Sequence, residues 1–250
     1  MTANDIRDRL ERRFLAAQTP FGRWRLNAYV TWKRLSWQGV VGSTLAIKRA
    51  FDIVVSFTAL VMFSPLYALL AVLVKLDGGP VFFRQTRIGL HGREFKMIKY
   101  RSMCVDAEAR LKELLQFNEK AEGVTFKMKD DPRITRVGRI LRKSSLDELP
   151  QFLNVLRGEM SLVGPRPPVP REVALYRQQD RRRLNVKPGI TCLWQVGERH
   201  GGWLEIGNRN QIDFAEQVHL DVRYIESMSF TRDLVLLLKT VPAILFGKGA

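Results

Sequence analysis

An uncharged, apolar stretch from Ile53 to Val74 constrains the fold of this chain most. Its 22 residues contain no Asp, Glu, Lys or Arg, and a helix of about 20 apolar residues is long enough to cross a bilayer. Ser64 and Pro65 lie at its middle, and a proline inside a helix removes a backbone hydrogen bond and kinks the axis. The sequence therefore predicts a membrane-associated helix that bends at Ser64-Pro65.

The charges that flank this stretch leave two topologies open. Lys48 and Arg49 precede it and Lys75 follows it, so the excess of basic residues favours neither orientation across a membrane. A helix that enters, bends and leaves on the same face would keep both basic flanks at one surface. A kinked helix that spans the bilayer agrees with these residues equally well.

Residues 1–47 form a basic arm with interleaved aromatic residues, among them Trp24, Trp32 and Trp37. This mixture suits a lipid headgroup region, and a solvated tail explains it as well. The whole chain carries a net charge of +16, which predicts an anionic partner such as a membrane surface, a phosphorylated substrate or a nucleic acid. Because no nucleic-acid-binding motif is present, we expect anionic membrane lipids and no nucleic acid.

The rest of the chain alternates two short strands with several helices. Residues 81–85 and 94–99 predict a hairpin around the glycine-containing loop 89–92. Helical periodicity predicts helices over 106–120, 134–143, 172–183, 214–226 and 233–246. The predicted fold class is α+β, predominantly helical with one small β-hairpin.

Two adjacent carboxylates, Asp147 and Glu148, stand at the centre of the most informative segment. Ser145 and Glu148 fit a capping box at the start of a helix. Asp147 would then lie in the first helical turn, where the helix dipole favours the anionic carboxylate and lowers its pKa. A capping box alone most often has only a structural role.

The basic residues around this pair point to phosphate chemistry. Arg139, Arg142 and Lys143 precede the carboxylates, and Arg166 follows them in a Gly-Pro-Arg-Pro-Pro run. Arginine holds phosphate oxygens in a bidentate fork, and a carboxylate binds Mg²⁺ or acts as a nucleophile. The segment therefore predicts a site that binds a phosphorylated substrate.

The segment from Arg142 to Pro168, RKSSLDELPQFLNVLRGEMSLVGPRPP, closely resembles the signature of the bacterial sugar transferases. These monotopic phosphoglycosyl transferases move a sugar phosphate from a nucleotide sugar to polyprenyl phosphate. The resemblance extends from about Lys48 to the C-terminus. It implies the re-entrant form of the membrane helix, with Ser64 and Pro65 at the bend.

The resemblance also implies roles for individual residues. Asp147 would be the nucleophile, and Asp147 and Glu148 would hold the Mg²⁺ cofactor. The expected substrate-binding residues are basic or amide side chains, namely Lys99, Arg101, Arg142, Arg166 and Gln195. From the residues alone, a structural salt bridge explains Lys99 or Arg101 equally well. The chain departs from the family pattern at Cys192 and at Gly197-Glu198, which puts the sugar end of the pocket in doubt.

The implied domain organisation is an arm over 1–47, a re-entrant helix over 48–76, and a cytosolic catalytic domain with interfacial helices over 77–250. The implied reaction transfers hexose 1-phosphate from a UDP-sugar to polyprenyl phosphate at the cytoplasmic face of the bacterial inner membrane, with homo-oligomerisation left open. Two alternatives remain: direct transfer in a ternary complex without a covalent intermediate, and a non-catalytic basic protein that binds anionic lipid.

Overall fold

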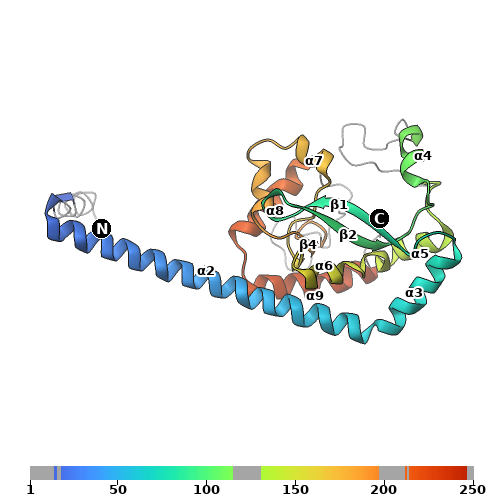
Figure 1. Cartoon of the computed structure of the whole chain (residues 1–250), viewed down its shortest axis with the longest axis horizontal. Helices are drawn as coiled ribbons and strands as arrows, with labels where there is room; N and C mark the ends of the chain where they lie inside the picture. The colour runs from blue at the N-terminus through green and yellow to red at the C-terminus, as the bar shows by residue number, and fades with distance from the viewer. Residues whose placement is uncertain (1–13, 16–17, 115–130, 197–211, 213, 247–250) are drawn as a thin grey trace. The chain divides into compact units, whose positions relative to one another are not determined.

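The structure is a computed structural model that describes residues 14, 15, 18–114, 131–196, 212 and 214–246 (Figure 1). Its contacts divide the chain into two units, Met1–Lys48 and Arg49–Ala250. In the first unit the described residues from Pro20 onward are helical and belong to α2 (Pro20–Met62). The described part of the predicted arm is therefore mostly helix, and its aromatic residues, such as Trp24 and Trp32, are exposed.

A bend joins α2 to α3 (Ser64–Leu76), with Phe63 between the two helices. Pro65 lies in the first turn of α3, where the absence of a backbone N–H costs little. Because proline has no N–H to donate, the hydrogen bonds of α2 cannot continue through this residue. The two axes meet at 65°, which confirms the predicted position of the bend. Within the described residues no single helix is both long and apolar enough to cross a bilayer, and α2 and α3 meet that requirement only as a pair.

The predicted hairpin is confirmed. Strands β1 (Phe82–Ile88) and β2 (Glu94–Tyr100) pair in an antiparallel register that runs from Phe82 opposite Tyr100 to Ile88 opposite Glu94. The connection is the short 3-10 turn η1 (Leu90–Gly92), in which His91 adopts a left-handed conformation. The hairpin gives the second unit, Arg49–Ala250, a two-stranded platform.

Short helices and a second pair of strands follow the hairpin (Figure 1). Strand β3 (Ser161–Val163) pairs with β4 (Gly189–Thr191) in parallel, a pairing that the sequence did not predict. The helical elements are α4 (Ala107–Leu114), α5 (Arg136–Lys143), η3 (Leu146–Glu148), α6 (Gln151–Arg157), α7 (Pro170–Ala174), η4 (Asp180–Asn185), α8 (Phe214–Glu226) and α9 (Phe230–Phe246). Together these elements confirm a mostly helical α+β fold.

Most of the predicted helices are present, and one is wrong. The helix predicted over 172–183 is broken into α7 and η4. The carboxylate of Asp180 turns back to accept a hydrogen bond of 2.9 Å from the backbone N–H of Arg177, and such local bonds compete with helix formation. The helix predicted over 214–226 coincides with α8, whereas α9 begins three residues earlier than predicted.

Two groups of buried apolar residues hold the second unit together. The larger group joins β2, α6, β3, α8 and α9 through residues such as Val155, Met160 and Leu193. The smaller group packs Leu70 and Val74 of α3 against Tyr100 and Leu141. The bent helix is therefore part of the core of this unit.

Polar contacts also fix α3 and the part of α2 from Arg49 onward to the rest of the second unit. Arg49 donates hydrogen bonds of 2.6 and 2.8 Å to the carbonyls of Val155 and Leu156 at the end of α6. The buried carboxylate of Asp52 accepts a bond of 3.0 Å from the backbone N–H of Leu162. On α3, the hydroxyl of Tyr67 donates to the carbonyl of Leu149 at 2.9 Å.

Candidate active site

One face of the β1–β2 hairpin forms the floor of a small polar cavity. Residues directly opposite each other in an antiparallel pair share a face, and the register sets Phe83 opposite Lys99, Gln85 opposite Met97 and Arg87 opposite Phe95. The hairpin, η3, α6 and the two segments around β3 and β4 together line the cavity with Arg87, Met97, Lys99, Glu148, Gln151, Arg166, Pro167, Gly189, Ile190 and Gln195. Two arginines, a lysine and a carboxylate thus converge on one space.

The close approach of two backbone segments brings Arg166 to this cavity. A Cβ atom added to Gly189 would lie 2.1 Å from the backbone nitrogen of Gly164, a distance that real Cβ atoms do not show. Glycine is therefore required at this crossing, where the Gly189 N–H donates to the Pro165 carbonyl at 2.9 Å. The crossing places Arg166 and Pro167 beside β4.

Arg87 is a site residue that the sequence analysis missed. Its guanidinium is buried and donates to Gln85 Oε1 at 2.6 and 3.1 Å and to the Pro167 carbonyl at 2.8 Å. Burial, with the positive charge of Arg166 nearby, lowers its pKa to about 10. Arg87 therefore remains a cation at neutral pH, and it is held rigidly at the cavity wall.

The predicted capping box at Glu148 is wrong. Ser145 has a positive φ of 56° and its side chain makes no capping hydrogen bond, and residues 146–148 form a single 3-10 turn rather than the start of a helix. Helix α6 begins at Gln151 instead. Glu148 Oε1 accepts a hydrogen bond of 2.7 Å from Lys99 Nζ on the hairpin. This ion pair ties the carboxylate turn to the cavity floor and brings together two of the predicted site residues.

Asp147 lies beside this pair but is only 9 % exposed. Burial raises the pKa of Asp147 from its ordinary value, and the nearby charge of Glu148 adds to the rise, although Lys99 and Arg142 oppose it. The expectation of a lowered pKa is therefore wrong, because desolvation of the carboxylate outweighs both nearby cations. Asp147 does not line the cavity itself.

Three other predicted substrate-binding residues occupy different positions. Arg142, in the last turn of α5, is close enough to Asp147 to lower its pKa. Gln195 lines the cavity, and its buried Oε1 has no hydrogen-bond partner among the described residues. Arg101 is directed away from it and donates to the carbonyls of Val74, Gly78 and Pro80. That placement favours a structural role for Arg101 at the end of α3. Gly197 and Glu198, at the sugar end, lie outside the described residues.

Arg166 is exposed to the cavity and is supported by an aromatic ring. Its guanidinium carbon lies 5.9 Å from the centroid of the Trp194 ring, within the range of a cation–π contact. Trp194 is itself buried, so the ring forms a fixed support. The guanidinium thus has its orientation restrained while its N–H groups stay available to an anion.

This arrangement predicts that Arg166→Lys lowers turnover about thirtyfold, because a charge-assisted contact of about 2 kcal/mol is lost. A lysine neither stacks on Trp194 in the same way nor presents a planar fork to phosphate. Steady-state rates of the purified variants measure the effect. Arg181→Lys, a change at an exposed arginine of η4, is the matched control. Equal small losses in both variants would mean that Arg166 only stiffens the proline turn.

A metal ion at this site would depend on ligands from the substrate as well as from the protein. Within the described parts of the chain, no group of three or more His, Cys, Asp or Glu side chains is arranged to hold a metal. Mg²⁺ commonly uses one or two carboxylates together with substrate phosphates, and Glu148 presents such a carboxylate to the cavity.

The part of the chain that forms this site is also the part that is similar to known proteins. The family model described as bacterial sugar transferase matches residues 43–247. The chain is 42 % identical over 207 residues to the exopolysaccharide production protein ExoY of Sinorhizobium fredii, covering 81 % of this chain and 87 % of that protein.

Two longer relatives show the same similarity. The chain is 45 % identical over 208 residues to the galactosyl transferase CpsE of Streptococcus agalactiae, covering 83 % of this chain and 44 % of that protein. It is 43 % identical over 211 residues to the undecaprenyl-phosphate galactose phosphotransferase of Salmonella typhimurium, covering 83 % and 42 %. It thus spans less than half the length of these two proteins. With these matches across the cavity, the bend and the carboxylate turn, the chain belongs to the bacterial sugar transferase family.

Proposed function

We propose that this protein transfers hexose 1-phosphate from a UDP-sugar to undecaprenyl phosphate and releases UMP. The observation that carries the proposal is the convergence of Arg87, Lys99 and Arg166 on a cavity that Glu148 also lines. Three cations around one carboxylate suit a diphosphate that is held together with a metal ion. Relatives with names that specify a UDP-sugar or undecaprenyl phosphate support the choice of substrates.

In the proposed first step, an oxygen of Asp147 attacks the β-phosphorus of the UDP-sugar. An aspartyl phosphate bond forms, the bond from that phosphorus to the bridging oxygen breaks, and UMP leaves with the oxygen. In the second step, an oxygen of the lipid phosphate attacks the same phosphorus and frees the Asp147 carboxylate. Covalent catalysis divides one difficult displacement into two.

The surrounding side chains would position and stabilise these phosphates. Arg87 is fixed by Gln85 and the Pro167 carbonyl, so its charge is pre-organised where negative charge gathers. Lys99 holds Glu148 and also favours the ionised form of Asp147. When bound at Glu148 and Asp147, Mg²⁺ would neutralise charge on the diphosphate.

A second candidate mechanism has one observation in its favour. Asp147 is nearly buried, which limits the access of a substrate to its carboxylate in the free enzyme. Direct attack by the lipid phosphate on the UDP-sugar, in a ternary complex, would not need an exposed Asp147. The order of product release separates these two mechanisms.

The test uses purified protein, UDP-galactose, UDP-glucose or UDP-N-acetylgalactosamine, and undecaprenyl phosphate in detergent. We expect UMP and a polyprenyl diphosphate sugar with one of these donors. We also expect at most one UMP per active site when the lipid is omitted. UMP that appears only after the lipid is added would support direct transfer, and lipid binding without any UMP would indicate a non-catalytic protein.

We also propose that the α2–α3 bend is a re-entrant membrane segment at the cytoplasmic face of the inner membrane. The bend of 65° at Phe63 and the basic flanks at Lys48 and Lys75 support this placement. Exposed apolar side chains on α3, including Leu69, Val72 and Leu76, would face the lipid. The polyprenyl phosphate acceptor would then meet the cavity at the headgroup level.

This topology predicts that cysteines placed at Leu45 and at Asp77 both react only from the cytoplasmic side. The background would carry Cys104→Ser and Cys192→Ala, which remove both native thiols. Labelling of spheroplasts and of inverted vesicles with an impermeant maleimide makes the measurement. Pro65→Ala restores a backbone N–H at the bend and should shift some molecules towards a span. Opposite sidedness in the parent protein would establish a kinked span instead.

A further inference from the structure

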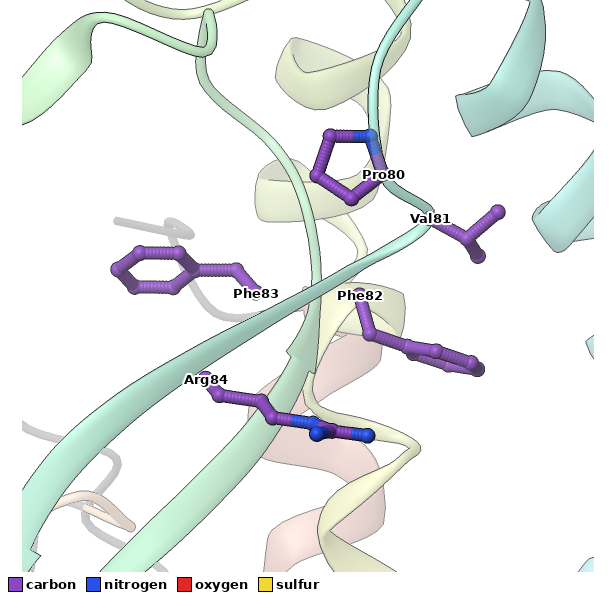
Figure 2. Close-up of a pocket in the computed structure, with 5 residues that line it drawn as sticks. All are labelled: Pro80, Val81, Phe82, Phe83 and Arg84. Carbon is purple, nitrogen blue, oxygen red and sulfur yellow. The ribbon is translucent and has the colours of Figure 1, made fainter.

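A second pocket lies outside the polar cavity, at the start of β1. It is an open depression of about 390 Å³, lined by Pro80, Val81, Phe82, Phe83 and Arg84 (Figure 2). Phe82 is 41 % exposed and Phe83 is 37 % exposed. The proposed chemistry uses neither of these phenylalanines, so their exposure needs another explanation.

The hairpin register connects this pocket to the polar cavity. Phe83 lies directly opposite Lys99, two residues along β1 from Gln85 and four from Arg87. Opposite side chains have Cβ atoms about 5 Å apart, and four residues of a strand span about 13 Å. A ligand on this face would therefore meet the exposed ring of Phe83 beside Lys99, with Arg87 about 13 Å further along the strand.

The other side of the strand continues the apolar surface towards α3. Figure 2 shows Phe82 and Phe83 pointing to opposite sides of the chain. The Phe82 ring stacks on Tyr100 at 5.4 Å, and Tyr100 lies 6.3 Å from the ring of Tyr67 on α3. On the side opposite to Phe83, the ring of Phe82 is thus connected through Tyr100 to α3.

We propose that this pocket binds the first isoprene units of the polyprenyl phosphate acceptor, while its phosphate lies at Lys99 and Arg87. The inference rests on the proposed function and adds the location of the lipid chain. The argument is complementarity: the acceptor joins a dianionic head to an apolar chain, and the hairpin face joins a cationic cavity to exposed Phe83 within one strand length. Arg84 at the pocket rim would stay at the headgroup level.

A cross-linking experiment tests the location directly. Undecaprenyl phosphate with a photoreactive diazirine in its first isoprene units is irradiated with the full-length protein in detergent. We expect label on the peptide that contains Pro80–Arg84, and we expect unlabelled undecaprenyl phosphate to compete. Label elsewhere would overturn the proposal. Equal competition by phosphatidylglycerol would also overturn it, because the pocket would then hold bulk lipid.

Kinetics of Phe83→Ser provide an independent readout. Loss of the ring should raise the KM for undecaprenyl phosphate about tenfold, while UMP release from the UDP-sugar alone stays unchanged. Phe83→Leu should restore most of the affinity. Leu175→Ser, which removes another exposed apolar side chain, should change neither quantity, and an unchanged KM in Phe83→Ser would contradict the proposal.

These experiments distinguish a failure of the proposed function from a failure of the lipid-binding proposal. Wild-type protein that releases no UMP from the donor alone would count against the covalent mechanism, yet the cross-link competition would still decide whether the pocket binds the acceptor.

Discussion

Asp147→Asn should abolish turnover while leaving the fold intact. The amide has the shape of the carboxylate but cannot act as the nucleophile that forms the aspartyl phosphate. Because Asp147 is nearly buried and its pKa is raised by desolvation, the neutral amide should not lower the melting temperature at neutral pH. Loss of UMP release together with an unchanged thermal unfolding curve is the expected result.

Trapping the aspartyl phosphate intermediate tests the role of Asp147 directly. Wild-type protein incubated with a UDP-sugar labelled in the sugar, without lipid, should retain label on the peptide that contains Asp147 after an acid quench. Glu148→Gln should fold and retain partial activity, because it removes one carboxylate and weakens the contact with Lys99 but keeps the nucleophile. If Asp147→Asn still supports lipid-dependent UMP release, the covalent mechanism is wrong.

The pH dependence of the first step follows from the same burial. An acid whose folded-state pKa is raised is ionised only above that raised pKa, so activity should fall as pH decreases through it. The acidic limb of UMP release should therefore lie at a higher pH than an ordinary aspartate would give. A limb at the ordinary aspartate value would mean that the carboxylate is solvated before it reacts.

Arg183→Met should produce the largest loss of stability in the catalytic unit. Arg183 of η4 and Asp221 of α8 form a buried ion pair of 2.5 Å, with side-chain exposures of 4 % and 1 %. Removing one partner leaves an unpaired buried charge and costs about 3–5 kcal/mol. The expected decrease in melting temperature is about 10 °C, measured by tryptophan fluorescence in detergent.

A second ion pair between η4 and α8 provides a matched control. Arg182 and Glu226 also form a pair of 2.5 Å, but both side chains are more than half exposed. Arg182→Met should therefore cost less than about 1 kcal/mol. Similar small losses in the two variants would show that the Arg183–Asp221 pair contributes little.

The pH dependence of the stability of Arg183→Met distinguishes an unpaired buried charge from a simple loss of packing. Burial raises the pKa of Asp221 to about 6, even though Arg183 opposes the rise. The stability that protonation supplies is complete below the unfolded pKa near 4 and is lost as pH rises through about 6. Without Arg183 this pKa rises further, so Arg183→Met should regain stability when the pH is lowered from 8 to 5.

Local sequence patterns predicted the elements that depend on neighbouring residues. Alternation and glycines predicted the hairpin, periodicity predicted α8, and Pro65 predicted the bend. The same alternation contained a signal for Arg87, since Gln85, Arg87, Met97 and Lys99 share one face once the hairpin register is known. That register depends on pairing between strands and is not a property of either strand alone.

Long-range contacts explain what the sequence could not predict. Glu148 fits a capping box by spacing, but Lys99, 49 residues away, binds it instead. The pKa of Asp147 was predicted in the wrong direction because its burial arises from tertiary packing. Arg101 resembled a phosphate ligand, yet its guanidinium binds carbonyls at the end of α3.

The hydrogen bonds that fix the bent pair of helices, α2 and α3, limit how these helices can move. Arg49 and Asp52 bind α6 and β3, and Tyr67 binds the carbonyl of Leu149, two residues from Asp147. A helix fixed at three places cannot act as a loose tether, so the catalytic unit and the bend would tilt together. In the membrane placement proposed above, the angle of the helix in the lipid, rather than the length of a linker, would set the height and direction of the active-site opening.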